Sequence, residues 1–236
     1  MSSLAIHENK IYSLGDSAVY TIPTPIFPNP TLWLRADAGV VKDGDDKVSQ
    51  WQDQSGNDYH AEQGSQSLKP LLVDVGVNGK PVLRFDGSQS LLIYFPVTFT
   101  NPYTFFIVGK SDYSGSSNSW FFSGEGDFPA LFQFASSNLR FNGGNGINYP
   151  KTSPWGDYYL YSINFNGGDS SAFENGIPII SGNLGTSSFS NLRIGARNNG
   201  AERLVGDISE IIIYNSPFSD PQRQSVENYL MAKYAL

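Results

Sequence analysis

The chain has 236 residues, a net charge of −7, a charged fraction of only 16% and no cysteine. The acidic balance argues against nucleic acid and anionic membranes as partners, and the missing cysteine excludes disulfides and thiolate chemistry. Aromatic residues make up 14% of the chain, which is enough to fill a packed core. The chain contains 24 glycines and 14 prolines but only 2 methionines, a composition that favours strands and turns over helices. The longest apolar run, 91–95, is too short to insert into a membrane.

Residues 1–30 differ in composition from the rest of the chain. Pro23, Pro25, Pro28 and Pro30 forbid a helix and favour extended chain. Apolar side chains are interleaved with them, which leaves either a disordered tail or an arm that packs on the domain or on a neighbouring subunit. We expect the arm, an N-terminal extended Pro-rich docking segment that adds a strand to a neighbour's sheet. Its predicted docking residues are Ile11, Tyr12, Val19, Tyr20 and Ile22.

From residue 31 onward, short apolar runs alternate with turn signals. Asn-Gly pairs, which supply the positive φ angles of tight hairpins, recur at 78–79, 142–143, 145–146, 166–167, 175–176 and 199–200. We predict strands at 32–36, 48–52, 81–85, 91–95, 103–108, 120–123, 131–134, 139–141, 158–165, 171–174, 191–195 and 204–214. This pattern predicts an all-β fold with two antiparallel sheets packed as a sandwich or jelly roll.

The segment 158–165 shows which of its residues face the core. Alternation places Tyr159, Tyr161, Ile163 and Phe165 on one face, which we expect to be buried. The opposite face is partly polar.

A single amphipathic helix is predicted at the C-terminus. Ser219 is its expected N-cap, Gln222 completes a capping box, and Pro221 lies in the first turn, where proline is tolerated. Val226, Tyr229, Leu230, Lys233 and Tyr234 then share one stripe. A lone helix of this length needs that stripe to pack on the sandwich.

Five motifs follow one another along the chain: LWLRAD at 32–37, VSQWQDQSGN at 48–57, NGKPVLRFDG at 78–87, GDISEIIIYN at 206–215 and VENYL at 226–230. Together they resemble the laminin-G-like branch of the concanavalin A-like jelly-roll superfamily over residues 31–236. The resemblance implies one domain of two stacked sheets, one convex and one concave. It implies little about activity, because the superfamily includes lectins, glycan-binding modules, adhesion domains, glycosidases and phage structural proteins.

Three residues within these motifs have roles that the sequence helps to narrow. Trp33 and Trp51 are large apolar anchors on strands, and we expect them to pack in the core rather than stack on a ligand. Glu210 lies within an apolar run, so it is a solvent-facing residue, a paired buried carboxylate or a metal ligand.

The loop that contains Asp53, Ser55 and Asn57 places side-chain oxygens at alternating positions. Such a loop is either a turn held by its own hydrogen bonds or a Ca²⁺ site. Asp58 and Gly64 occupy the positions at which an EF-hand loop needs Gly and Glu, which favours the turn. We expect no other cofactor.

The motifs contain no recognisable set of catalytic residues. Glucanases of the resembling fold carry Glu-x-Asp-x-x-Glu on one strand, whereas here Glu125 and Asp127 are followed by Ala130, so one carboxylate of the pair is lost. The two histidines, His7 and His60, accompany no Gly-x-Ser-x-Gly elbow and no His-based ligand set. We therefore expect that the protein is not an enzyme.

Polar loops rich in Asn, Gly, Ser and Arg surround several aromatic residues. Sugars are bound by aromatic faces together with side chains that hydrogen-bond to hydroxyls, although similar loops also serve simply as turns. The ligand-facing residues that we predict are Tyr113, Trp120, Tyr149 and Arg197.

These observations favour a non-catalytic attachment or decoration protein of a phage virion, whose sandwich loops bind glycans. Its expected partners are neighbouring subunits, through the arm, and cell-surface glycans. The N-terminal residues lack the basic and apolar regions of a secretory signal, so we expect a virion-surface or other extracellular setting reached by another route. The alternatives are a secreted lectin-like carbohydrate-binding module and, third, a glycosidase.

Overall fold

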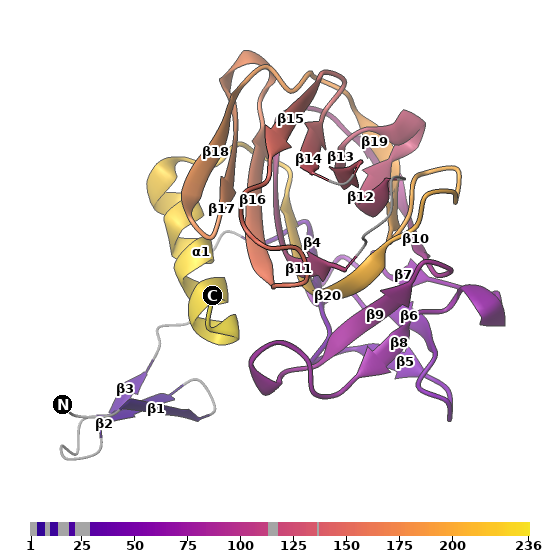
Figure 1. Ribbon diagram of the computed structural model, residues 1–236, viewed down its shortest axis with the longest axis vertical. Helices are drawn as coiled ribbons and strands as arrows, with labels where there is room; N and C mark the ends of the chain where they lie inside the picture. The colour runs from indigo at the N-terminus through magenta and orange to yellow at the C-terminus, as the bar shows by residue number, and fades with distance from the viewer. Residues whose placement is uncertain (1–3, 8–9, 14–18, 22–28, 113–117, 136) are drawn as a thin grey trace.

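The computed structural model describes residues 4–7, 10–13, 19–21, 29–112, 118–135 and 137–236. Its main body consists of two large antiparallel sheets packed face to face, with one α-helix at the C-terminus (Figure 1). The all-β sandwich with a single C-terminal helix, as predicted from the sequence, is confirmed.

Strands far apart in the sequence lie side by side in both sheets. The nine-stranded sheet has the order β15 (Gly146–Pro150), β14 (Asn138–Asn142), β13 (Ala130–Phe134), β12 (Ser119–Gly124), β19 (Phe189–Ile194), β10 (Leu91–Phe99), β7 (Ala61–Glu62), β6 (Val48–Trp51) and β5 (Val40–Lys42). The eight-stranded sheet has the order β18 (Ile177–Gly182), β17 (Ser170–Glu174), β16 (Tyr159–Phe165), β11 (Tyr103–Ser111), β20 (Val205–Tyr214), β9 (Val82–Asp86) and β8 (Leu71–Val73), and β4 (Leu32–Arg35) pairs with β20.

The strands that the apolar pattern misses are short or lie at sheet edges. They are β5, β7, β8, β15 and β18. Edge strands bury less of their surface, so their sequences alternate weakly; β15, for example, contains both Gly146 and Pro150. Four short 3₁₀ turns complete the main body, η1 (Gln66–Leu68), η2 (Val77–Gly79), η3 (Glu125–Asp127) and η4 (Gly167–Asp169).

The main core fills the space between the two sheets. Trp51 is fully buried there, and Phe105 of one sheet stacks on Phe122 of the other with ring centroids 4.8 Å apart. The alternation predicted for 158–165 is confirmed, because Tyr159 and Phe165 both belong to this core. Aromatic packing across the sheets therefore holds the sandwich together.

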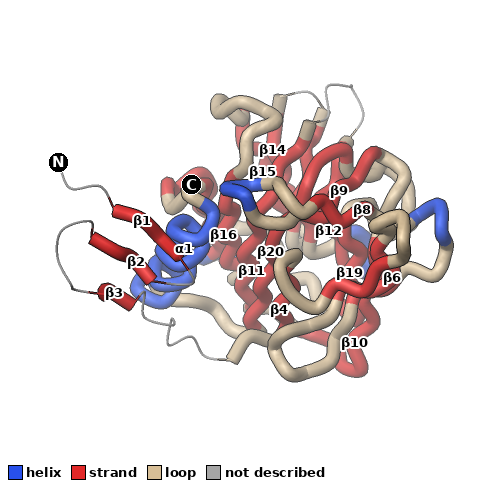
Figure 2. Tube along the Cα trace, turned by 90° about the horizontal axis from the view of Figure 1, so that it is seen from below, coloured by secondary structure: helices blue, strands red, loops and turns tan. Residues whose placement is uncertain are grey.

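The helix α1 (Asp220–Tyr234) covers part of the outer face of the eight-stranded sheet (Figure 2). Ser219 is its N-cap, and the backbone N–H of Ser219 donates to Oε1 of Gln222 at 2.9 Å, as the predicted capping box requires. Val226 and Leu230 form a second core with Phe106 on β11. Of the helices that the structure describes, none has the length and hydropathy of a membrane span.

The described parts of the N-terminal segment are extended and form a small sheet of their own. Its described parts, β1 (Leu4–His7), β2 (Lys10–Ser13) and β3 (Val19–Thr21), pair antiparallel with one another as a small three-stranded sheet. Since β2 is the central strand, both of its edges are already paired. Ile11 and Tyr12 lie on β2, Val19 and Tyr20 lie on β3, and Ile22 falls outside the described residues. A neighbour's strand would therefore have to pair with β1 or β3.

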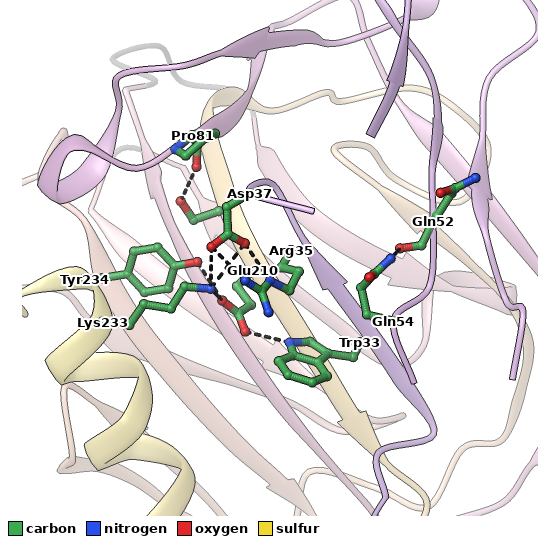
Figure 3. A network of polar contacts seen from close by, with 10 residues as sticks. Trp33, Arg35, Asp37, Gln52, Gln54, Pro81, Glu210, Lys233 and Tyr234 are labelled. Carbon is green, nitrogen blue, oxygen red and sulfur yellow. Dashed lines mark hydrogen bonds and ion pairs between the residues drawn. The ribbon is translucent and has the colours of Figure 1, made fainter. Parts of the chain in front are cut away.

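A buried carboxylate connects the helix to the sheet beneath it. Glu210, on β20, is 1% exposed, and its oxygens accept hydrogen bonds from Trp33 Nε1, Lys233 Nζ and Tyr234 OH, each at 2.6 Å (Figure 3). Glu210 is thus the paired buried carboxylate among the three roles that the sequence left open. Trp33 is half-buried against the helix layer, so it packs structurally like Trp51.

A second carboxylate completes this network. Asp37 accepts a hydrogen bond from Arg35 at 2.6 Å, and Lys233 Nζ lies 3.2 Å from it (Figure 3). Partial burial alone would raise the pKa of Asp37, but the hydrogen bond from Arg35 and the charge of Lys233 outweigh it and lower the pKa below its ordinary value. Burial and the negative charge of Glu210 raise the pKa of Tyr234.

We expect Glu210→Gln to destabilise the fold strongly. The neutral amide cannot accept from all three donors and leaves the buried Lys233 ammonium with less compensating charge, a change that costs roughly 3–5 kcal/mol. Urea unfolding followed by tryptophan fluorescence measures the loss. The control is Lys42→Gln, which removes the exposed ion pair with Asp46 and leaves the unfolding midpoint nearly unchanged. Equal midpoints for Glu210→Gln and the wild type would contradict this role.

Candidate functional site

The two sheets differ in what covers their outer faces. The helix packs on the eight-stranded sheet, on the side of the sandwich opposite to β12, β13, β14 and β19 (Figures 1 and 2). We call the face of the nine-stranded sheet that points away from the main core the open face. This face carries Tyr94, whose side chain is 74% exposed. The other large apolar side chains that are exposed in the described part of the chain are aliphatic.

A cluster of aromatic rings lies on the open face over β12 and β13. Trp120 stacks on Phe132 with centroids 3.8 Å apart and planes 9° apart, and Phe134 meets Phe132 edge-on at 6.1 Å. Two guanidinium groups flank these rings, since Arg197 lies 5.7 Å from the Trp120 centroid and Arg140 lies 5.4 Å from that of Phe134. Cation–π attraction holds both arginines against the rings.

The acidic residues near this cluster are already paired. Arg197 forms ion pairs with Asp127 at 2.6 Å and with Glu202 at 3.3 Å. Glu125 accepts a hydrogen bond from Ser190 Oγ at 2.6 Å. Glu125 and Asp127 both lie in the turn η3 rather than on a strand, so they lack the alternating placement of the glucanase pattern.

Next to this cluster, the paired strands β10 and β19 carry a row of side chains on the open face that includes Tyr94, Asn191 and Arg193. Tyr94 pairs directly with Asn191, and Leu92 pairs with Arg193, so Tyr94 and Arg193 are diagonal neighbours on the open face. Arg193 Nε donates to the Asn198 carbonyl at 2.9 Å, and Nη1 donates to Ser90 Oγ at 3.2 Å. The side-chain oxygen of Asn191 is buried and has no hydrogen-bond partner within the described chain.

Two arginines lie close together at this row, although the protein as a whole is acidic. Burial lowers the pKa of the Arg193 guanidinium below its ordinary value; nearby Tyr94 opposes this, and the positive charge of Arg203 adds to it. Arg203 pairs with Trp120 in an isolated parallel bridge, which places it on the same face. An exposed aromatic ring therefore lies on the same face as a half-buried amide and two half-buried guanidinium groups.

The structure brings together only two of the four predicted ligand residues. Trp120 and Arg197 are neighbours, and Trp120 is only 4% exposed, so little of its ring is available to stack on a ligand. Tyr149 lies on β15 and is partly buried against the main core. Tyr113 falls outside the described residues.

The sequence analysis missed Tyr94, Asn191 and Arg193. A signal for Tyr94 was available in the strand 91–95, since its neighbours Ile93 and Phe95 are buried and alternation directs Tyr94 outward. An exposed aromatic residue in the middle of a strand is a stronger indication of binding than an aromatic residue in a loop.

The Asp53 loop is a turn tied to β4. Oδ1 of Asp53 accepts from the backbone N–H groups of Trp33 and Ser55, each at 2.9 Å, and Oδ2 accepts from Ser55 Oγ at 2.7 Å and Tyr59 N at 3.1 Å. Asn57 Nδ2 donates to the Thr31 carbonyl at 3.0 Å. Within the described ranges no group of three His, Cys, Asp or Glu side chains could hold a metal ion.

We expect Ca²⁺ and the chelator EGTA to leave the melting temperature unchanged, because the Asp53 oxygens are already used by protein donors. Asp53→Ala should lower the free energy of unfolding by about 1–3 kcal/mol, since buried backbone donors lose their acceptor. Differential scanning calorimetry measures both effects. A rise in melting temperature with Ca²⁺ that disappears in Asp53→Asn would instead show an ion at this loop.

Sequence comparison places the chain in no family, because no family model and no curated protein matches it. The fold is shared with several solved structures. The botulinum neurotoxin serotype G binding domain matches with a TM-score of 0.64 and 11% identity over 86% of this chain and 52% of that one. Domain 4 of an extracellular arabinanase from Geobacillus stearothermophilus, in complex with arabinotriose, matches with a TM-score of 0.61 and 14% identity over 84% of this chain and 98% of that one.

The Trypanosoma rangeli sialidase in complex with sialic acid matches with a TM-score of 0.62 and 17% identity. That match covers 99% of this chain but only 44% of the sialidase, so the chain spans less than half of that enzyme. At such identities the likeness shows the β-sandwich fold that is shared with these domains.

Proposed function

We propose that this protein is a non-catalytic glycan-binding module that acts through the open face of its nine-stranded sheet. The observation that carries the proposal is the exposed Tyr94 ring beside Asn191 and Arg193. A flat aromatic face packs against the C–H patches of a sugar, and amide and guanidinium groups hydrogen-bond to its hydroxyls.

Similar architecture in carbohydrate-associated proteins supports this proposal. The arabinanase domain that matches nearly over its whole length is in complex with arabinotriose, and the neurotoxin match is a binding domain. A laminin-G-like assignment, which the sequence motifs suggest, is part of the same proposal. The polar side chains of Asn191 and Arg193 beside Tyr94 locate the proposed binding site on the open face.

We also propose that the module has no hydrolytic activity. Glu125 and Asp127, the carboxylates closest to the glucanase pattern, bind Ser190 and Arg197 and lie in a turn. A glycosidase needs two carboxyl groups opposed across the sugar, one of them free to transfer a proton. The arrangement around η3 favours a structural role for both residues.

Tyr94→Ala should weaken glycan binding by roughly tenfold, because the variant loses the stacking surface. A glycan array identifies the ligand, and titration calorimetry compares the variant with the wild type. The matched control is Ile177→Ala, which removes a 66% exposed side chain from the edge of the other sheet. Neither change should alter the melting temperature, since both side chains are exposed. An array without a hit, or equal affinities, would contradict the proposed function.

A surface-displayed setting, on a phage virion, extends this proposal. Its support is the N-terminal segment, which contributes a small sheet whose outer strands, β1 and β3, each pair on one side only within the described residues. Edge strands offer backbone groups to a strand of another chain, so this segment suits attachment to a neighbouring subunit. Secretion as an independent lectin-like module is the alternative setting.

Deletion of residues 1–30 should abolish incorporation into particles but spare folding, because the strands of both large sheets and the described members of their buried clusters lie from Leu32 onward. Co-sedimentation with assembled particles measures incorporation, and circular dichroism measures folding. The matched control deletes only residues 1–3. Normal incorporation of the 1–30 deletion would exclude the arm as an attachment device and leave glycan binding unaffected.

A further inference from the structure

The arginines of this chain divide into two groups by their partners. The chain has seven arginines, and all lie within the described residues. Four form ion pairs with carboxylates, namely Arg35, Arg84, Arg197 and Arg223. The other three, Arg140, Arg193 and Arg203, are without a carboxylate partner in the described structure, and all three lie on or beside the open face.

The unpaired arginines retain most of their hydrogen-bonding capacity. A guanidinium group has five N–H donors, and Arg193 uses two of them, toward Asn198 and Ser90. The side chain of Arg203 makes no hydrogen bond or ion pair with the described residues, and its Nε is buried without a partner. The indole Nε1 of Trp120, which lies beside Arg203 in the β-bridge, is also a buried donor without a partner.

Leaving these donors unmatched is costly. Half-buried like charges repel each other, and a buried donor without an acceptor loses its hydration. The acidic residues on or beside this face form no ion pair with Arg193 or Arg203 in the described structure. Asp127 and Glu202 bind Arg197, Glu125 accepts from Ser190, and Glu62, which pairs with Leu92, accepts from Gln50. Arg193 and Arg203 are therefore two neighbouring cations without a directly bound carboxylate.

We infer that the open face binds an anionic saccharide, with Arg193 and Arg203 holding its acidic group and Tyr94 stacking on its ring. This inference rests on the proposed glycan-binding function and adds the chemical class of the ligand. A carboxylate or sulfate accepts paired N–H donors from a guanidinium group. A neutral sugar would satisfy the stacking surface but not the two guanidinium groups.

The test uses full-length protein and pairs of ligands that differ only in charge. One pair is oligogalacturonate and its methyl ester, and the other is dextran sulfate and dextran; together they distinguish a carboxylate from a sulfate. We expect one acidic member to bind at least tenfold more tightly than its neutral counterpart. Binding should weaken as NaCl is raised, because salt screens the charges.

Variants then locate the binding. Arg193→Gln and Arg203→Gln should each reduce the preference for the acidic ligand over its neutral counterpart by roughly tenfold, because each removes one charged pair of donors. Arg193→Lys should restore only part of the affinity, because an ammonium group lacks the planar pair of donors. Lys80→Gln, which removes the same charge at a position near α1, is the control and should have no effect.

Removing one of two neighbouring like charges offsets the loss of the Arg193 hydrogen bonds to Asn198 and Ser90, so the variants should stay folded, which their melting temperatures check. Equal binding of the acidic and neutral members, with no effect of either arginine variant, would overturn the anionic ligand and leave the glycan-binding module intact. If neither member of any pair binds, and the glycan array also has no hit, both the inference and the proposed function fail.

Discussion

The contact between Glu210 and the C-terminal helix determines how the two sides of the sandwich differ. A carboxylate in an apolar strand is tolerable only when donors surround it, and Trp33, Lys233 and Tyr234 provide them. Two of those donors come from the last turn of the helix. The helix is therefore fixed over the eight-stranded sheet by a polar contact as well as by apolar packing, and the nine-stranded sheet keeps its outer face open.

That asymmetry explains where charge accumulates. Beneath the helix, Arg223 pairs with Glu227 and Lys233 pairs with Asp37, although Arg223 Nε and Glu227 Oε1 stay buried without a hydrogen-bond partner in the described residues. On the open face, the side chains of Arg193 and Arg203 have no carboxylate partner among the described residues. The two faces therefore differ in whether their guanidinium groups are paired with carboxylates, and buried polar atoms without a partner occur on both.

Much of the fold could be predicted from the sequence. The strand pattern from 103 to 108 and the alternation of 158–165 were sufficient, because each strand has a buried face that follows the pleat. The cap at Ser219 fixed the start of the helix. Short edge strands such as β18 could not be predicted, since Ile177 and Pro178 are exposed and leave no periodic signal.

The site was harder to predict than the fold. Polar loops with aromatic residues suggested Trp120 and Tyr149, but the tertiary packing buries the first and turns the second toward the core. Tyr94 and Arg193 lie almost a hundred residues apart, and only the pairing of β10 with β19 brings them together. Cross-strand register of this kind depends on the whole topology, which no local motif encodes.

One glycine links backbone geometry to the charge of the open face. A methyl group added at Gly146 would lie 2.3 Å from Nη2 of Arg140, because the guanidinium rests directly on the glycine while Nη1 donates to Asn148. Any side chain there would displace the cation from its place above Phe134. A side chain at residue 146 would therefore change where Arg140 places its charge on this face, although Gly146 contributes no functional group of its own.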